Sequence, residues 1–116
     1  NGYDVEVDIR SINGDLWLGH DKPQYKIEHK WLQKRRKNLW IHCKNLQAAK
    51  ECWEYQAFCH SSDPYVYTSN GKIWLHDLSS EIDDDVIIPL IDNPYYEKHT
   101  SEYPYGICTD YPSLLK

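Results

Sequence analysis

Two acidic side chains stand two positions apart near the start of the chain, at Glu6 and Asp8. Apolar residues alternate with them, a pattern typical of a strand, so both carboxylates are predicted to lie on one face. Two neighbouring carboxylates repel each other unless a cation, a shared proton or a basic group compensates them. Divalent cations such as Mg²⁺ and Ca²⁺ prefer such oxygen ligands, which makes this pair a candidate metal site.

A histidine–aspartate pair, His20 and Asp21, follows a short apolar segment. The dipeptide Asn13-Gly14 is a strong turn signal and predicts a hairpin between the acidic strand and a second strand over 16–19. A histidine at the end of that hairpin could act as a general acid or base beside the two carboxylates.

Four patterns occur in a characteristic order along the chain: Glu-x-Asp-x-Arg over 6–10, an apolar strand ending in His-Asp over 16–21, the strand-like segment 38–44, and Tyr-Gly-Ile-Cys-Thr-Asp-Tyr-Pro over 105–112. In this order they resemble the glycerophosphodiester phosphodiesterase family, whose members are TIM barrels related to phosphatidylinositol phospholipase C. The resemblance implies hydrolysis of a glycerophosphodiester or a related alcohol phosphate in lipid metabolism. It also implies one divalent metal ion, Mg²⁺, Ca²⁺ or Mn²⁺, as cofactor.

The resemblance and the chemistry of the residues together give an expected role to each of eight residues. These are Glu6, Asp8 and His42 as metal ligands, His20 and Lys44 as catalytic residues, and Arg10, His60 and Asp110 as substrate-binding residues. His20 would protonate the leaving alcohol, while Lys44 and Arg10 would contact the phosphate. His60 is a candidate for the second proton-transfer histidine.

Two departures from the family pattern matter. The family begins with a strand bearing His-Arg-Gly, which supplies the second catalytic histidine, and no such strand precedes Asn1. The third acidic ligand is replaced by His42, which shifts the metal preference toward ions such as Mn²⁺ or Zn²⁺. We therefore expect a single domain over 1–116 that lacks its first strand, with the missing strand or a second chain closing the barrel. A catalytically impaired subunit that binds a ligand or has a structural role is the alternative function.

Composition limits the classes of protein that fit. A chain of 116 residues corresponds to one domain, about half the roughly 250 residues of a complete TIM barrel. The net charge of −5 argues against nucleic acid as a partner. The longest apolar run, 86–91, is too short for a membrane span, which needs about 20 residues. The four cysteines lack Cys-x-x-Cys spacing, and reduced thiols in a cytoplasmic protein are the expected state.

The pattern along the chain predicts an α/β fold, a reduced or incomplete TIM-like barrel with short strands and few helices. The expected strands are 4–10, 16–19, 39–43, 56–59, 65–68, 72–75, 86–90 and 106–109. Helices are expected over 27–37 and over 46–54, the second capped by Asn45, with a helical turn over 94–99. Several intervals are too short for a helical crossover, so loops would replace some of the helices.

Each assignment has a structural alternative. Glu6 and Asp8 fit the exposed face of a half-buried strand, and His20-Asp21 fits an ordinary loop. His42 and His60 fit histidines with a purely structural role, and Asp-x-Pro at Asp110 is also a turn signature. The basic run 34–37 is either a solvated helix end or a patch that attracts anions.

Overall fold

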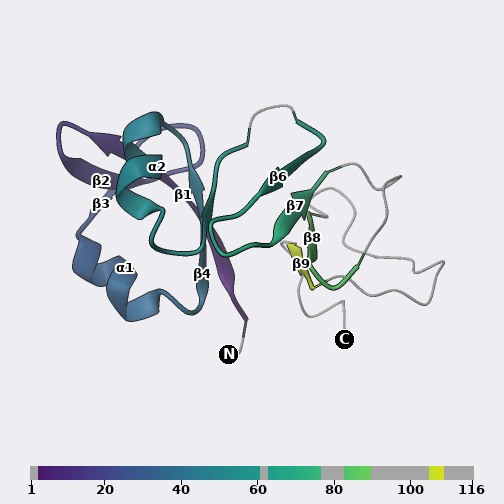
Figure 1. The fold of residues 1–116 in the computed structure, drawn as a ribbon. Coiled ribbons are helices and arrows are strands. Elements are labelled where there is room, and N and C mark those ends of the chain that lie inside the picture. Colours follow the sequence, from purple (N-terminus) through teal and green to yellow (C-terminus); the bar gives the residue numbers. More distant parts are fainter. Residues whose placement is uncertain (1–2, 61–62, 77–82, 90–104, 109–116) are drawn as a thin grey trace. The chain divides into compact units, whose positions relative to one another are not determined.

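The protein is described by a computed structural model that places residues 3–60, 63–76, 83–89 and 105–108. These residues fall into two compact units (Figure 1). The first unit holds residues 3–60 and also residues 68–70. The second unit holds the remaining described residues, and each unit contains one sheet.

The first unit is built on a five-stranded mixed sheet with the strand order β3-β2-β1-β4-β5. The strands are β1 (Val5–Ile12), β2 (Asp15–Leu18), β3 (Tyr25–Ile27), β4 (Leu39–Cys43) and β5 (Ala57–Phe58). Strands β1, β2 and β3 pair antiparallel, whereas β4 lies parallel to both β1 and β5. The predicted turn at Asn13 and Gly14 is confirmed, because both residues have positive φ, 52° and 85°, as a tight hairpin turn requires.

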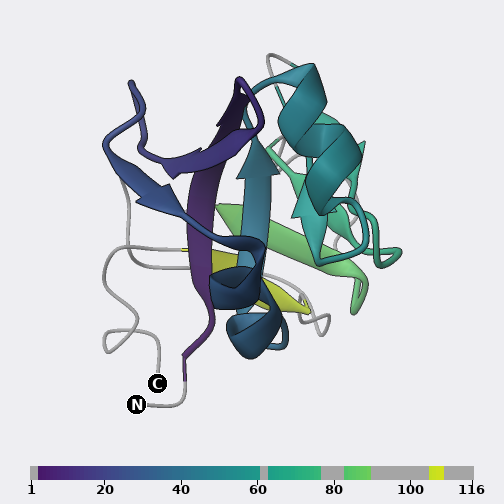
Figure 2. The same ribbon diagram turned by 90° about the vertical axis from the view of Figure 1, so that its left-hand side faces the viewer.

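Two short helices, α1 (His29–Arg35) and α2 (Leu46–Cys52), cover one face of this sheet (Figure 2). Ile9 of β1 and Ile41 of β4 point to that face and are buried against the helices, together with Leu32 of α1. Side chains alternate along a strand, so Asp8 and His42 start from the opposite face. Because the apolar side chains of β1 and β4 face the helices, the polar side chains that alternate with them face the other way.

The second unit is a four-stranded mixed sheet with the order β6-β7-β8-β9. Its strands are β6 (Tyr65–Tyr67), β7 (Ile73–Leu75), β8 (Val86–Pro89) and β9 (Gly106–Cys108). Strand β6 is antiparallel to β7, and the other pairs are parallel. A small core of Leu75, Val86 and Ile88 holds the described part of this unit together.

The prediction of a TIM-like barrel is wrong. The described strands form two separate mixed sheets, and α1 and α2 are the two helices among the described residues, so the structure is a small α/β domain. A closed barrel needs each strand to be paired on both sides. Here β3 and β5 end one sheet, and β6 and β9 end the other. The expectation of a missing strand or second chain that closes a barrel loses its basis with the barrel itself.

The individual elements were predicted better than their assembly. Strand β4 has the expected bounds, and α2 begins after its predicted cap, Asn45. Strand β1 extends two residues further than expected, to Ile12. The expected helix over 27–37 is shorter, because Tyr25–Ile27 forms β3 before α1 begins. The expected turn over 94–99 lies outside the described residues.

Neither α1 nor α2, each seven residues long, has the length or apolar content of a membrane-crossing helix, and these are the helices in the described part of the chain. The cysteines Cys43, Cys52, Cys59 and Cys108 are free thiols, the first two buried. Burial raises the pKa of the Cys52 thiol to about 12, with the nearby charge of Glu51 adding to the effect, so this thiol stays protonated and unreactive.

Asn45 links α2 to the end of β1. Its Oδ1 accepts hydrogen bonds from the Ala48 backbone N–H at 3.0 Å and from the Ser11 N–H at 3.2 Å. Its Nδ2 donates to the Ser11 carbonyl at 2.9 Å. One amide side chain thus caps the helix and satisfies both backbone groups of a buried strand residue.

Replacement of Asn45 by Ala removes all three hydrogen bonds and leaves the Ser11 backbone groups buried without them. We expect the free energy of unfolding to fall by about 2 kcal/mol or more. Urea denaturation followed by circular dichroism measures this change. Gln47→Ala, at an exposed position of the same helix, is the control and should change stability by less than about 0.5 kcal/mol. Equal stability of the two variants would contradict the role of Asn45.

Candidate functional site

The candidate site is centred on the carboxylate of Asp8 in β1. Its side chain is 8% exposed, and its two oxygens contact different histidines. Oδ2 lies 2.9 Å from Nδ1 of His20, and Oδ1 lies 3.3 Å from Nδ1 of His42. These histidines are 12 and 34 residues away in the sequence, so the sheet brings three distant segments together around one acid.

The pairing of β1 with β4 positions His42. Asp8 is the register partner of His42, which is in turn the partner of Phe58 in β5. The His42 ring stacks on the Phe58 ring at 4.9 Å between centroids, with 12° between the planes. Its Nε2 lies 3.3 Å from the His60 carbonyl oxygen, which can only accept a hydrogen bond, so Nε2 is assigned as the protonated donor. Nδ1 is thereby directed at Asp8.

The β2–β3 connection positions His20. The Gly19 N–H donates to the Asp8 carbonyl, and the Arg10 guanidinium donates to the carbonyls of Gly19 and His20 at 2.7 and 3.2 Å. Gly19 has a φ of 154°, and a Cβ there would collide with the backbone carbonyl oxygen of Lys22. Only glycine therefore fits the turn that delivers the histidine.

His20 combines a fixed end with an open end. Its Nδ1 is held by Asp8, yet the side chain as a whole is 84% exposed. Its Nε2 lies 3.7 Å from a carboxylate oxygen of Asp21, whose side chain is 93% exposed. A carboxylate that holds one ring nitrogen while the other faces solvent is the arrangement used for general acid–base catalysis.

The pKa of Asp8 lies well below its ordinary value of 3.8. Burial opposes ionisation, but contacts with His42, hydrogen bonding with Glu6 and the hydrogen bond with His20 together outweigh it. Asp8 is therefore a carboxylate throughout the neutral range. Glu6 and Asp8 offer acidic oxygens within the same small cluster, and two neighbouring acidic groups attract positive charge.

The predicted metal ligands Glu6, Asp8 and His42 do lie together. Each offers one ligand atom, and these atoms are all within 4.8 Å of one another. Oδ1 of Asp8 is buried and, within the described residues, accepts no well-aligned hydrogen bond. Ligand atoms about 2.0–2.2 Å from a metal lie roughly 3 to 3.5 Å apart, which the 3.3 Å between Asp8 and His42 already matches. The donor set of two carboxylates and one imidazole fits a divalent ion such as Mn²⁺.

The remaining predicted residues are less closely tied to this centre. Lys44 follows β4 and is half-buried, and its backbone N–H donates to the Ile9 carbonyl. Two positions beyond His42, it starts from the same face of the sheet as that histidine. His60 contributes its carbonyl oxygen to the His42 ring. Asp110 lies outside the described residues, so its role stays a prediction.

The structure brings together four of the residues predicted from the sequence, Glu6, Asp8, His20 and His42, through contacts that the sequence does not indicate. Sequence reasoning assigned Arg10 to the substrate, whereas in the structure its two terminal nitrogens hold the Gly19 and His20 carbonyls. It missed Gly19 altogether, although a glycine directly before a candidate catalytic histidine is a signal for a constrained turn. It also treated Asp8 only as a metal ligand and did not predict that the same side chain orients His20.

No protein-family model matches the chain, and neither a curated protein nor a solved structure is significantly similar to it. The resemblance to the glycerophosphodiester phosphodiesterases thus remains a prediction from the motifs. What supports a function beyond those motifs is the geometry around Asp8. That geometry consists of an exposed histidine held by Asp8 and three side chains whose ligand atoms lie within 4.8 Å of one another.

Asp8→Asn should remove the charge that holds both histidines, and at about pH 5 we expect a loss of about 2 kcal/mol in the free energy of unfolding. The pKa of Asp8 is depressed in the folded state. The ionised side chain therefore stabilises the fold fully at pH values above its ordinary pKa of 3.8, and this stabilisation is lost as the pH falls below 3.8. The difference between wild type and variant should therefore shrink from about pH 5 to about pH 2. Urea titrations at each pH, with a chelator present, measure it.

Asp21→Asn is the matched control, since the Asp21 side chain is almost fully exposed. It should leave both the stability and its pH dependence unchanged. A difference between wild type and Asp8→Asn that stays constant down to about pH 2 would contradict the depressed pKa.

Proposed function

We propose that this protein is a metal-dependent phosphodiester hydrolase that acts on a glycerophosphodiester or a related alcohol phosphate. The observation that carries the proposal is that the two oxygens of the Asp8 carboxylate contact different histidines. One oxygen orients an exposed histidine, and the other faces His42 within a cluster suited to a cation. Phosphodiester cleavage needs both functions, a proton donor for the leaving alcohol and positive charge at the phosphoryl oxygens.

Glu6, Asp8 and His42 would hold the divalent ion, Mg²⁺, Ca²⁺ or Mn²⁺. A bound ion supplies Lewis-acid polarisation of a phosphoryl oxygen and offsets charge that develops on it. The three side chains reach this arrangement through the β1–β4 register. Asp8 lies opposite His42, and Glu6 lies two residues before Asp8 on the same face of β1. Their positions therefore depend on backbone pairing rather than on a flexible loop.

His20 would protonate the leaving alcohol from Nε2. Asp8 holds Nδ1–H, which fixes the ring and stabilises its protonated form, and the exposed Nε2 side is accessible to a substrate. Lys44 would attract the phosphate as a point charge. Arg10 contributes by positioning His20 through its two carbonyl contacts, and a contact from Arg10 to the substrate remains part of the proposal.

One observation favours the second candidate function, a catalytically impaired ligand-binding or structural subunit. The Nε2 of His42 is held by the His60 carbonyl and its ring stacks on Phe58, while Arg10 is committed to the backbone. A polar cluster anchored in this way can hold β1, β2 and β4 in register without turnover. The activity experiment below distinguishes the two functions.

A cytoplasmic location is proposed as well. Its support is the set of four free cysteines, because unpaired thiols are typical of a reducing compartment. Cys43 and Cys52 are buried, which suits small apolar core residues better than bridging partners.

Hydrolysis of glycerophosphodiesters should require a divalent ion and the two histidine-linked functions. With Mg²⁺, Ca²⁺ and Mn²⁺ tested in turn, Glu6→Gln and His20→Ala should each lower kcat by about 100-fold or more, because they remove a cation ligand and the general acid. Release of the free alcohol measures turnover. Glu28→Gln and His29→Ala, exposed positions next to and within α1, are the matched controls and should retain activity.

Unchanged activity in both site variants would exclude the mechanism. If the wild-type protein shows no turnover with any of the ions and yet binds a phosphate ester, the impaired-subunit function is the correct one. Thermal unfolding of each variant, followed by circular dichroism, separates lost chemistry from lost structure.

Cation binding can be measured without any substrate. Asp8→Asn and His42→Ala should each weaken Mn²⁺ binding at least about tenfold in calorimetric titrations, since each removes a ligand atom. Asp63→Asn, an exposed acid outside the cluster, should bind Mn²⁺ as the wild type does. Equal affinities across all of these proteins would show that the cluster is not a metal site.

A further inference from the structure

The charge of this chain is distributed very unevenly. Residues 22–37 contain seven cations and one acid, a charge of +6, whereas all other residues carry six cations and seventeen acids, a charge of −11. The segment includes β3, at one edge of the sheet, and α1, which packs on the apolar face of the sheet. Such local asymmetry in an acidic chain is typical of a surface that recognises an anion.

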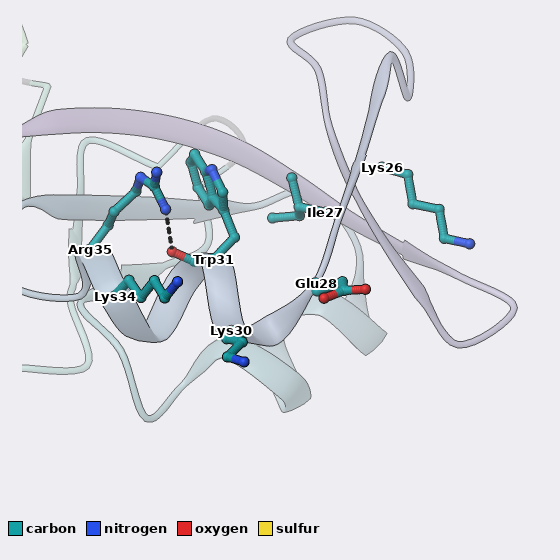
Figure 3. Close-up of a pocket in the computed structure, with 7 residues that line it drawn as sticks. All are labelled: Lys26, Ile27, Glu28, Lys30, Trp31, Lys34 and Arg35. Carbon is teal, nitrogen blue, oxygen red and sulfur yellow. Dashed lines mark hydrogen bonds between the residues drawn. The ribbon is translucent and has the colours of Figure 1, made fainter.

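The structure gathers part of this charge around a hollow along α1, shown in Figure 3. The hollow has a volume of about 710 Å³, and its lining includes four cations, Lys26, Lys30, Lys34 and Arg35. Glu28 is the one acidic side chain in the lining. We call this feature the α1 hollow. The hollow is open to solvent, and its volume lies within the range of about 300 to 1,000 Å³ that small-molecule sites span.

Two of the four cations have partners that hold them in place. The Arg35 guanidinium lies 4.5 Å from the centre of the Trp31 ring and donates to the Trp31 carbonyl at 3.2 Å (Figure 3). Lys26 lies 3.5 Å from an oxygen of Asp15. Arg35 is thus pre-ordered with its charge intact, whereas the charge of Lys26 is partly balanced.

Lys30 and Lys34 are different. Among the residues that the structure describes, no carboxylate lies within ion-pair distance of either lysine. They are four positions apart, about 6 Å along one helix face, where like charges destabilise a helix. The negative end of the helix dipole explains a cation at Lys34 but not at Lys30, which lies in the first turn. An anion bound between them would relieve this repulsion.

We propose that the α1 hollow is a binding site for a small polyanion that carries at least two phosphate groups. Lys30 and Lys34 bind the phosphates, and Arg35, ordered on Trp31, adds a two-pronged donor. The volume and the charge together select this ligand. A long polymer would extend from the hollow over the rest of the first unit, whose residues outside 22–37 include three cations and seven acids, a charge of −4, so a compact polyanion gains the attraction without that repulsion. The site is separate from the Asp8 cluster, which lies on the opposite face of the sheet.

The experiment is a calorimetric titration of the full chain with tripolyphosphate at physiological salt, in the absence of divalent ions. The double variant K30Q/K34Q should bind at least about tenfold more weakly than the wild type, because two charged contacts to a multiply charged ligand are lost. Glutamine has a helix propensity close to that of lysine, so α1 is retained.

The matched control is K37Q/K50Q, which removes the same charge at exposed positions outside the hollow and should weaken binding by less than about twofold.

Three results would overturn the proposal: no binding by the wild type, equal weakening in the two double variants, or tighter binding of single-stranded RNA or anionic phospholipid vesicles than of tripolyphosphate. The last result would assign the surface to a macromolecule or a membrane instead of a small ligand.

Discussion

The first unit depends on one buried charge, the carboxylate of Asp8. Taking a carboxylate out of water is costly unless partners compensate it, and here the partners come from β2–β3, β4 and β1 itself. The charge therefore requires that the parallel β1–β4 pair and the connection after β2 both be in place. A slip of β1 by one residue against β4 would turn Asp8 into the apolar layer beside Ile41, where nothing compensates it.

One face of the sheet carries the buried apolar side chains that stabilise the unit, and the other carries the polar side chains of the candidate site. The face that packs on α1 and α2 is apolar and closed, with Ile9, Leu32 and Ile41 almost fully buried. The opposite face carries Glu6, Asp8 and His42 in a row set by strand register. Because both faces belong to the same strands, the packing that stabilises one face fixes the spacing of side chains on the other. The cluster is thus positioned by paired strands with a buried apolar face, as a metal or proton-transfer site needs.

Local patterns predicted much of this arrangement, and the long-range pairing was the part that failed. The alternation in β1, the Asn13-Gly14 turn and the Asn45 cap are all signalled by neighbouring residues, and the structure contains each of them. Nothing local states which strand lies beside which, so a series of short strands was assembled into a barrel that the two sheets exclude. Residue type marks Glu6, Asp8 and His42 in the sequence, and these side chains do lie together, whereas the main-chain contacts of Arg10 were not predicted. Those contacts involve carbonyl oxygens, which every residue has and no sequence pattern marks.

The way in which Arg10 holds the end of the β2 arm bears on how this site could evolve. The guanidinium grips the carbonyl oxygens of residues 19 and 20, and the Gly19 N–H meets the Asp8 carbonyl, so the backbone at position 20 is located without help from the side chain there. The side chain at position 20 can therefore be exchanged without loss of the contacts that place its backbone, provided that Arg10 and Gly19 are kept. Any side chain at this position starts beside the Asp8 carboxylate, so the scaffold separates the placement of residue 20 from its chemical identity.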